Sequence, residues 1–305
     1  MRKLLILLGV AGVSLSAPFI RMSTAPSMVL VLYRVLIAAA LLLPCVLLRN
    51  RDELRRMDRK SLGLCLMSGL FLGLHFSCYF EAIRYTSIAS AVALTDTEVF
   101  FVAFMMLLLF RETIPLRAWA GILLTFAGSL LIALSDAGTG DNVLLGDLIA
   151  LAAAACMAVY TMIGRICRKE ITTATYTYLV YSSAAVTVLV ILLCSGTPLF
   201  GYGSVNWLTA LGMAVFCTLL GHSVFSWGLK YESAAFISTV KLLEPVFAGI
   251  LGFLLFGEVP KAQVILGGCI VILGVYVYSR FFESRPERSD PASGSDPEPG
   301  EGRAG

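Results

Sequence analysis

Charged residues are scarce in this sequence. Of 305 residues only 14% are Asp, Glu, Lys or Arg, whereas 58% are hydrophobic, and the mean hydropathy is +0.86. A typical soluble domain has about 25% charged and about 45–50% apolar residues. So few charged side chains cannot cover a soluble core of this size, which means that lipid must replace water around most of the surface. This excludes a secreted, nuclear or cytosolic protein with a single anchor.

The patterns of metal, redox and nucleotide chemistry are missing too. All eight cysteines lie in or at the edge of apolar stretches and none forms a C-x-x-C pair, which favours free thiols that behave as small buried hydrophobes. The sequence has no His-Glu-x-x-His, no Gly-x-Ser-x-Gly and no Gly-rich phosphate loop. We therefore expect no cofactor, no metal and no enzymatic activity. A net charge of only +3, spread along the chain, also argues against a nucleic-acid partner.

What the sequence does contain is a series of ten apolar runs. A helix needs about 20 mostly apolar residues to span a bilayer. The first run resembles a signal peptide, but its apolar character continues past Ala17, and the bulky Leu15 is unsuited to a cleavage site, so we expect it to remain as the first span. The predicted spans are 4–20, 28–48, 62–83, 88–110, 117–135, 145–164, 173–194, 206–229, 234–256 and 262–280.

Lysine and arginine are distributed unequally between the two ends of these spans. Basic residues concentrate in the cytoplasmic connections of membrane proteins. If the N-terminus is cytoplasmic, 18 of the 23 basic residues fall inside and only Arg21, Arg84 and Lys261 fall outside. We therefore predict a multi-pass protein of the plasma or inner membrane with both termini in the cytoplasm. The 18 are Arg2, Lys3, Arg49, Arg51, Arg55, Arg56, Arg59, Lys60, Arg111, Arg117, Arg165, Arg168, Lys169, Lys230, Arg280, Arg285, Arg288 and Arg303.

The chain also repeats itself. An offset of 146 aligns residues 84–132 with 230–278 without a gap. Since each copy has five spans, the second copy enters the membrane from the opposite side, which predicts an inverted repeat suited to alternating access. We expect a first repeat over 1–138, a second over 139–282 and a disordered cytoplasmic tail, rich in Pro, Gly, Ser and acid, over 283–305. The matches include Tyr85 with Tyr231, Glu98 with Glu244, Glu112 with Glu258, Gly121 with Gly267 and Gly128 with Gly274.

Two segments carry a family resemblance: RYTSIASAVALTDTEVFFVAFMMLLLFRETIPLRAWAGILLTFAGSLLIAL and KYESAAFISTVKLLEPVFAGILGFLLFGEVPKAQVILGGCIVILGVYVYS. They resemble the two copies of the EamA domain of the drug/metabolite transporter superfamily. The resemblance covers nearly all of residues 4–282 and implies ten helices in two inverted five-helix repeats around a central cavity that passes small organic metabolites. Arg34 fits the family pattern. One departure is Val99, which stands where the second copy has Pro245.

Ionisable residues at membrane depth are costly and are candidates for function. Glu98 and Glu244 lie near the middle of the fourth and ninth spans. They are either substrate-amine or proton sites, or hydrogen-bond partners that hold the halves in register. Lys241, one turn before Glu244, either neutralises it or contacts a substrate carboxylate. Asp96 lies about 200° around the helix from Glu98, so the two cannot both point squarely into one cavity.

Three further polar residues lie within predicted spans. Arg34 snorkels or pairs with an acid, so a structural role is favoured, although it also contributes to mixed midplane charge. His75 and His222 lie at similar depths in corresponding spans, and the repeat register misses pairing them by one residue. They are either proton-coupling groups that titrate near neutral pH or satisfied interior histidines. The small-residue positions Gly69, Gly73, Gly121, Gly128, Gly267 and Gly274 predict close helix packing.

These observations favour a secondary transporter of small amino-acid-like or amphipathic metabolites that works by alternating access. The alternative is an intramembrane enzyme that acts on a lipid-linked substrate. The expected partners are a small-molecule substrate and the lipid bilayer; proton coupling and homodimerisation are left open.

Overall fold

The computed structural model describes residues 2–86, 88–134, 143–257 and 259–281, which form helices and contain no strand. The predicted repeat boundary at 138 and the tail over 283–305 lie outside these ranges. The first half comprises α1 (Arg2–Ser14), α2 (Ser16–Arg21), α3 (Ser27–Arg49), α4 (Arg51–Arg56), α5 (Arg59–Tyr85), α6 (Ile88–Thr95), α7 (Glu98–Phe110) and α8 (Leu116–Leu134). The second comprises α9 (Val143–Cys167), α10 (Thr173–Cys194), α11 (Ser204–Gly212), η1 (Met213–His222), α12 (Ser223–Gly228), α13 (Ala234–Lys241), α14 (Glu244–Phe256) and α15 (Ala262–Phe281).

These helices have the lengths and surfaces of membrane spans. Within the described residues nine helical segments are long and apolar enough to cross a membrane, and a tenth, Leu116–Ile132, is slightly shorter. The 23 residues of α3 extend about 34 Å, against a hydrocarbon core of about 30 Å. Large apolar side chains face outward, as at Leu48, which is 85% exposed. The predicted fold class is confirmed: the chain is an all-α multi-pass membrane protein.

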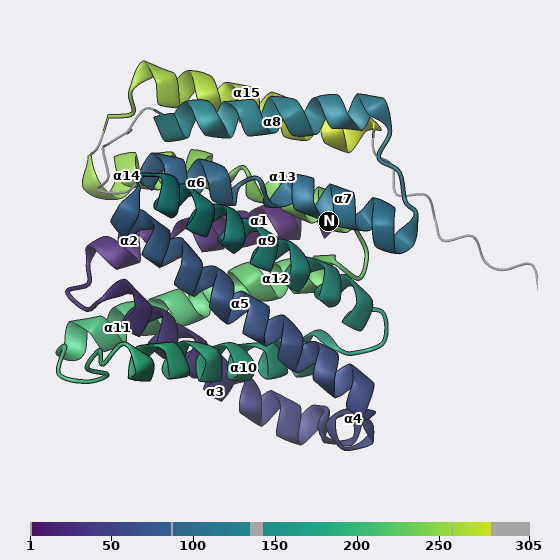
Figure 1. Ribbon diagram of the computed structural model, residues 1–305, viewed down its shortest axis with the longest axis vertical. Coiled ribbons are helices and arrows are strands. Elements are labelled where there is room, and N and C mark those ends of the chain that lie inside the picture. The colour runs from purple at the N-terminus through teal and green to yellow at the C-terminus, as the bar shows by residue number, and fades with distance from the viewer. Residues whose placement is uncertain (1, 87, 135–142, 258, 282–305) are drawn as a thin grey trace, which may run out of the picture.

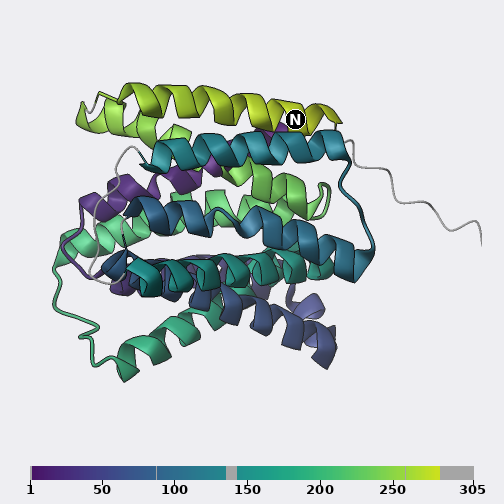
Figure 2. The same cartoon turned by 45° about the horizontal axis from the view of Figure 1, so that its top comes forward.

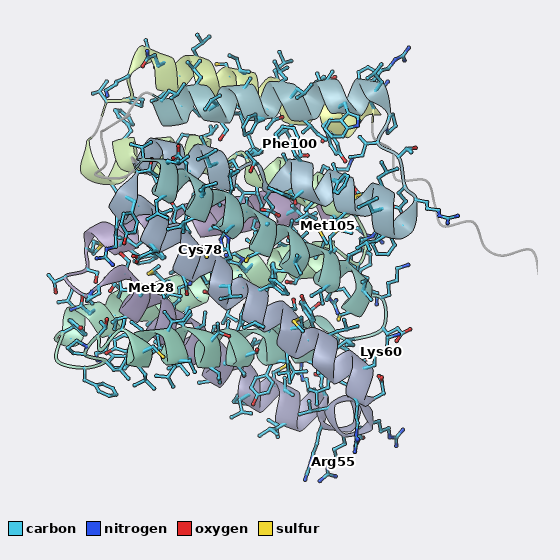
Figure 3. The ribbon with its side chains drawn as sticks, in the orientation of Figure 1. Met28, Arg55, Lys60, Cys78, Phe100 and Met105 are labelled. Carbon is cyan, nitrogen blue, oxygen red and sulfur yellow. The ribbon has the colours of Figure 1, made fainter. Side chains whose placement is uncertain are left out.

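The helices lie roughly side by side in one bundle (Figures 1 and 2). The connections 49–59, 111–116, 165–172 and 229–233 lie at one end, here named the basic end, which is on the right in Figure 1, where α4 is found. Figure 3 shows Arg55 and Lys60 at this end. The connections 22–26, 195–203 and 259–261 lie at the opposite end. Basic side chains therefore gather where the sequence predicts the cytoplasm.

The two halves interlock rather than stand apart. Equivalent spans pack on each other across the halves: α3 on α10, α7 on α13, and α8 on α15, which run together along one edge in Figures 1 and 2. The first span, α1, packs on η1 of the eighth, and the sixth span, α9, packs on α5 of the third. In the repeat the first span corresponds to the sixth and the eighth to the third, so these two contacts are equivalent. This is expected of two five-helix repeats around a pseudo-two-fold axis.

Glycines bring the α8–α15 pair into close contact. A methyl group on Gly128 would lie 2.7 Å from the carbonyl oxygen of Gly267, and one on Gly274 would lie 2.3 Å from Oγ1 of Thr125. Gly69 of α5 approaches α10 in the same way. This confirms the predicted packing role of these glycines, because backbones this close leave no room for a side chain.

The fourth and ninth spans, predicted as single helices, are each interrupted at the same point of the repeat. The fourth is α6 and α7, broken at Asp96 and Thr97, and the ninth is α13 and α14, broken at Leu242 and Leu243. In α14 the proline ring of Pro245 stands in the first turn, where a missing N–H costs nothing. The first half has Val99 at that position, so the break does not require proline. Each break leaves a glutamate in the first turn of the following half-helix.

The eighth span contains a π-helix, η1, that ends at His222. The side chain of Thr218 bonds the carbonyl of Met213, five residues earlier, at 3.2 Å. The corresponding third span, α5, is regular. π-Helical turns are rare, and those that occur are often found at functional sites. His222, the last residue of η1, is buried in the bundle interior.

Candidate functional site

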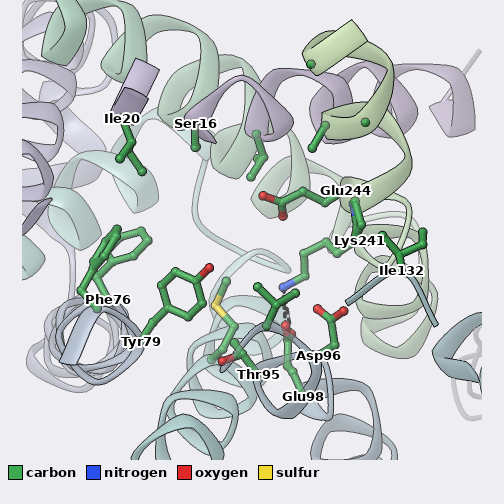
Figure 4. A pocket seen from close by; sticks show the side chains of 18 of the residues that line it. Ser16, Ile20, Phe76, Tyr79, Thr95, Asp96, Glu98, Ile132, Lys241 and Glu244 are labelled. Atoms are coloured by element: carbon green, nitrogen blue, oxygen red, sulfur yellow. Dashed lines mark hydrogen bonds and ion pairs between the residues drawn. The ribbon is translucent and has the colours of Figure 1, made fainter. Parts of the chain in front are cut away.

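A cavity of about 630 Å³ lies between the two halves. The interrupted fourth and ninth spans border it, so that Glu98 and Glu244 begin half-helices at its wall (Figure 4). Carboxylates in the first turn of a helix are stabilised by the helix dipole. All seven residues that the sequence singles out line this one cavity: Arg34, His75, Asp96, Glu98, His222, Lys241 and Glu244.

The cavity extends to one end of the bundle only. Its lining runs from the middle of the spans to Ile20, Phe80 and Pro260, which lie at the end opposite the basic end. Among the described lining residues none belongs to the basic-end connections 49–59, 111–116, 165–172 or 229–233. The cavity is therefore closed towards the basic end.

Glu98 is the most heavily bonded of the seven residues. Lys241 donates to both of its carboxylate oxygens, at 2.9 and 2.8 Å, and the hydroxyls of Thr161 and Ser238 donate at 3.1 and 2.9 Å. Glu98 is only 7% exposed, so these four bonds compensate for removing its charge from water. Every donor comes from the second half of the chain, which makes Glu98 a junction between the repeats.

Lys241 thus contacts a different acid from the one expected. The spacing predicts a local pair with Glu244, one turn away on the same face. A break at Leu242 separates the two residues, so they no longer share one helix face, and Lys241 instead reaches across to Glu98 (Figure 4). One of the two predicted roles of Glu98 is to hold the two halves in register through a hydrogen bond between helices. Lys241 is a specific partner for that role.

Glu244 and Asp96 have different surroundings. The backbone carbonyl of Glu244 accepts a bond from Ser14 at 3.1 Å, whereas its side chain has no hydrogen bond or ion pair within the described residues and points into the cavity (Figure 4). Asp96 accepts a bond from Ser129 of α8. Although its angle on an ideal helix would turn it away from Glu98, the break at Asp96 lets both residues line the cavity.

Arg34 and the two histidines share an aromatic neighbour. The guanidinium of Arg34 lies over the ring of Phe76, 4.5 Å from its centroid, and the ring of His222 meets the same ring edge-on at 5.7 Å. Nδ1 of His75 bonds the carbonyl of Ala153 at 3.0 Å. His75 therefore has the interior partner that a structural histidine needs. Nδ1 of His222 and both Nε and Nη2 of Arg34 have no hydrogen-bond partner in the described part of the chain.

Polar contacts tie the basic end together. Arg165 of the second half pairs with Glu112 of the first at 2.6 Å. Arg168, which sequence alone places in an exposed connection, is buried and donates to the carbonyl of Ser226 at 3.1 Å and to the hydroxyl of Thr173 at 2.6 Å.

Glu53 of α4 caps the N-terminus of α10 at the same end. It accepts from the backbone N–H of Thr172 at 2.7 Å and from the hydroxyls of Thr172 and Thr175. Partial burial alone would raise the pKa of the Glu53 carboxyl, but these bonds outweigh it and hold that pKa below its ordinary value.

Several cavity residues escape sequence reasoning. Phe76, Thr95 and Ser16 line the cavity, but apolar and hydroxyl side chains are common in any span, so no signal distinguishes them. Thr161 and Ser238, the donors to Glu98, are missed for the same reason. The aromatic ring of Tyr79 also lines the cavity (Figure 4). Among the described residues no group of three His, Cys, Asp or Glu could hold a metal ion.

A central cavity that contains charged side chains, in a multi-span helical bundle and bordered by interrupted helices, is the architecture of a membrane transporter. The family model of EamA-like transporters matches residues 3–134 and 144–280. The chain belongs to the EamA-like transporter family, as its resemblance implied, and the family and its relatives support transport of a small molecule across a lipid membrane.

Individual relatives are similar along most of their length. The pseudopaline exporter CntI of Pseudomonas aeruginosa is 26% identical over 261 residues, which cover 85% of this chain and 88% of that protein. An uncharacterized transporter of Clostridium kluyveri is 25% identical over 245 residues, 78% of this chain and 79% of that protein. A crystal structure with 17% identity superposes with a TM-score of 0.75 over 92% of this chain and 99% of its own, which is evidence for the fold alone.

Proposed function

We propose that this protein is a secondary transporter of small zwitterionic or amphipathic organic metabolites that works by alternating access. The observation that carries the proposal is the cavity itself: it places carboxylates and basic groups together at the centre of the bundle, among apolar and aromatic walls. A volume of about 630 Å³ falls within the range of small-molecule sites, about 300–1,000 Å³. A cavity with positive and negative side chains beside an apolar wall suits a molecule that carries a positive charge, a negative charge and an apolar part.

We place the basic end in the cytoplasm, because 18 of the 23 basic residues fall on that side of the spans. In this orientation both termini are cytoplasmic, the membrane is the plasma or inner membrane, and the cavity faces outward. The Glu98–Lys241 and Glu112–Arg165 pairs then form the closed cytoplasmic side.

Inward opening follows from the inverted repeats. If the two halves exchange conformations, the end that is now open closes and the basic end opens. Glu244 then takes the position that Glu98 holds now. Lys241 corresponds in the repeat to Thr95, so the ion pair that holds the basic end closed has no charged counterpart at the other end. The exchange must break the Glu98–Lys241 pair, and a cationic group on a substrate is suited to compete for Glu98.

Proton coupling is a further part of the proposal. His75 and His222 both line the cavity, and imidazoles can change charge near neutral pH. His75→Gln with His222→Gln should flatten the dependence of flux on pH. An unchanged pH profile in the double variant would remove the histidines from the coupling mechanism.

Flux in proteoliposomes tests the transport proposal. Purified full-length protein is reconstituted, and uptake and efflux of a panel of amino-acid-like and amphipathic compounds are followed with Glu98→Gln, Glu244→Gln and the matched control Glu170→Gln. Glu170 is exposed and outside the cavity. We expect flux of at least one zwitterionic compound in wild type and control, and a loss of about tenfold or more in the two cavity variants. Wild-type flux in both cavity variants at equal reconstitution would refute their assignment.

A further inference from the structure

Arg34 is a buried cation with two side-chain nitrogens that lack a hydrogen-bond partner among the described residues. It is 3% exposed, lies about two turns into α3 and lines the cavity. Its Nε and Nη2 atoms have no hydrogen-bond partner among the described residues. Lys241, the other basic residue within the spans, is already bonded to both oxygens of Glu98. A buried charged group with unmade hydrogen bonds is costly, so the N–H groups of Arg34 are suited to bind an anion that enters the cavity.

The surroundings of Arg34 suit a planar anion. A guanidinium presents N–H groups in a rigid fork that matches the two oxygens of a carboxylate. The ring of Phe76 supports the guanidinium from one side, and the same ring contacts His222. Nδ1 of His222 is also without a partner, and an imidazole nitrogen that carries its proton is a donor. Two unpaired polar groups therefore stand beside one aromatic ring at the cavity wall.

The opposite side of the cavity carries acidic side chains. Figure 4 shows Phe76 on one side of the cavity and Glu244 and Asp96 on the other. The carboxylate of Glu244 has no side-chain partner among the described residues, whereas Glu98 is neutralised by Lys241. The cavity thus has, among the described residues, a cation with unmade hydrogen bonds at one side and a carboxylate without a hydrogen bond or ion pair at the other.

We propose that Arg34, with His222 beside it, forms a binding subsite for the carboxylate of the transported molecule, whose ammonium group is oriented towards Glu244. This inference rests on the proposed function, and it assigns to Arg34 the carboxylate contact that the sequence alone offers to Lys241. It also gives the zwitterion a fixed direction: its carboxylate lies against α3 and its ammonium against the first turn of α14. A substrate that lacks the carboxylate leaves the guanidinium of Arg34 unpaired and binds more weakly.

Two probes that share one phenyl group separate the two sides of the cavity. 3-Phenylpropanoate carries only the carboxylate and 2-phenylethylamine only the ammonium, and both match the aromatic walls formed by Phe76 and Tyr79. The dissociation constant of each is measured from the rise in unfolding temperature of the full-length protein in detergent, because a ligand of the folded state stabilises it. The variants are Arg34→Gln, Glu244→Gln and the matched control Arg117→Gln, which changes an exposed arginine outside the cavity.

We expect 3-phenylpropanoate to stabilise wild type, Arg117→Gln and Glu244→Gln, and to bind about tenfold or more weakly to Arg34→Gln. The amine should give the reverse result, with binding kept in Arg34→Gln and weakened in Glu244→Gln. Absence of stabilisation by 3-phenylpropanoate in wild type, or equal affinity in Arg34→Gln, would overturn the subsite. If Arg34→Gln fails to fold, Arg34→Lys, which keeps the charge but not the fork, must weaken the carboxylate probe selectively; an unchanged affinity there would also overturn it.

The failure of this inference can be told apart from the failure of the transport proposal. If the carboxylate probe binds selectively but no compound is transported, the Arg34 subsite stands and the transport proposal is refuted. If Arg34→Gln transports a zwitterion at the wild-type rate and with the wild-type half-saturating concentration, the transport proposal stands and the Arg34 subsite is refuted.

Discussion

The Glu98–Lys241 pair makes a quantitative prediction about stability. Lys241→Met removes the donor at 2.8 and 2.9 Å from the two oxygens of Glu98 and leaves a 7% exposed carboxylate with only the hydroxyls of Thr161 and Ser238. Breaking a buried pair on one side costs about 3–5 kcal/mol, because one charge stays behind uncompensated. Since two hydroxyl donors remain, we expect the lower end, about 3 kcal/mol. Glu98→Gln, which strands Lys241, should cost a similar amount.

The double variant Glu98→Gln/Lys241→Met should be more stable than either single variant. It removes both charges, and replacing a whole buried pair by neutral groups is often nearly neutral. The assay is thermal unfolding of detergent-purified protein at a fixed scan rate. The exposed Arg84–Glu81 pair, at 3.1 Å, is the control cycle and should show at most about 1 kcal/mol of coupling. Single variants as stable as wild type, or a double variant whose loss equals the sum of the single losses, would refute the reasoning.

Three further predictions concern the framework around the cavity. Gly128→Val should destabilise the protein by several kcal/mol or prevent folding, because a methyl group there would lie 2.7 Å from the carbonyl oxygen of Gly267; unfolding midpoints check this, with the open position Gly63→Val as control. Pro245→Ala should leave the break before α14 in place, because the first repeat breaks with Val99; flux close to wild type is the expected result, and a loss as large as that of Glu244→Gln contradicts it. Glu53→Gln should cost about 0.5–1 kcal/mol at neutral pH, since the carboxylate is only partly buried. The Glu53 contribution is present above the pKa of the unfolded state and disappears as pH falls through the lowered pKa of the folded state, so wild type and variant should converge in unfolding midpoint at acid pH.

Most of the fold could be predicted because the membrane simplifies the problem. Apolar runs separated by charged connections define spans, and α10 begins and ends at the predicted residues 173 and 194. The repeat of Glu98 at Glu244 indicates two related halves, and the small residues Gly128 and Gly267 indicate where helices approach closely. Each of these signals is local in the sequence or recurs at one fixed offset.

The interior of the site could be predicted only in part. The cost of ionisable groups in lipid identifies residues that line the cavity, but not their partners. Lys241 is one turn from Glu244 in sequence, yet it bonds Glu98, 143 residues away, because the helix breaks between the first two. No sequence signal marks that break in the first repeat, which has Val99 instead of a proline. Nor does the sequence indicate that Arg34 lacks a partner, since that depends on every neighbouring helix.

The central claim is that the two ends of the bundle open alternately and that the Glu98–Lys241 pair holds the basic end closed. Spin-label distances test it directly in a background without native cysteines: Thr113→Cys with Glu170→Cys reports the basic end, and Met22→Cys with Val259→Cys the opposite end; all four positions are exposed. We predict that Glu98→Gln lengthens the first distance and shortens the second. Distances that lengthen together, or that both stay as in the wild-type background, would contradict the account.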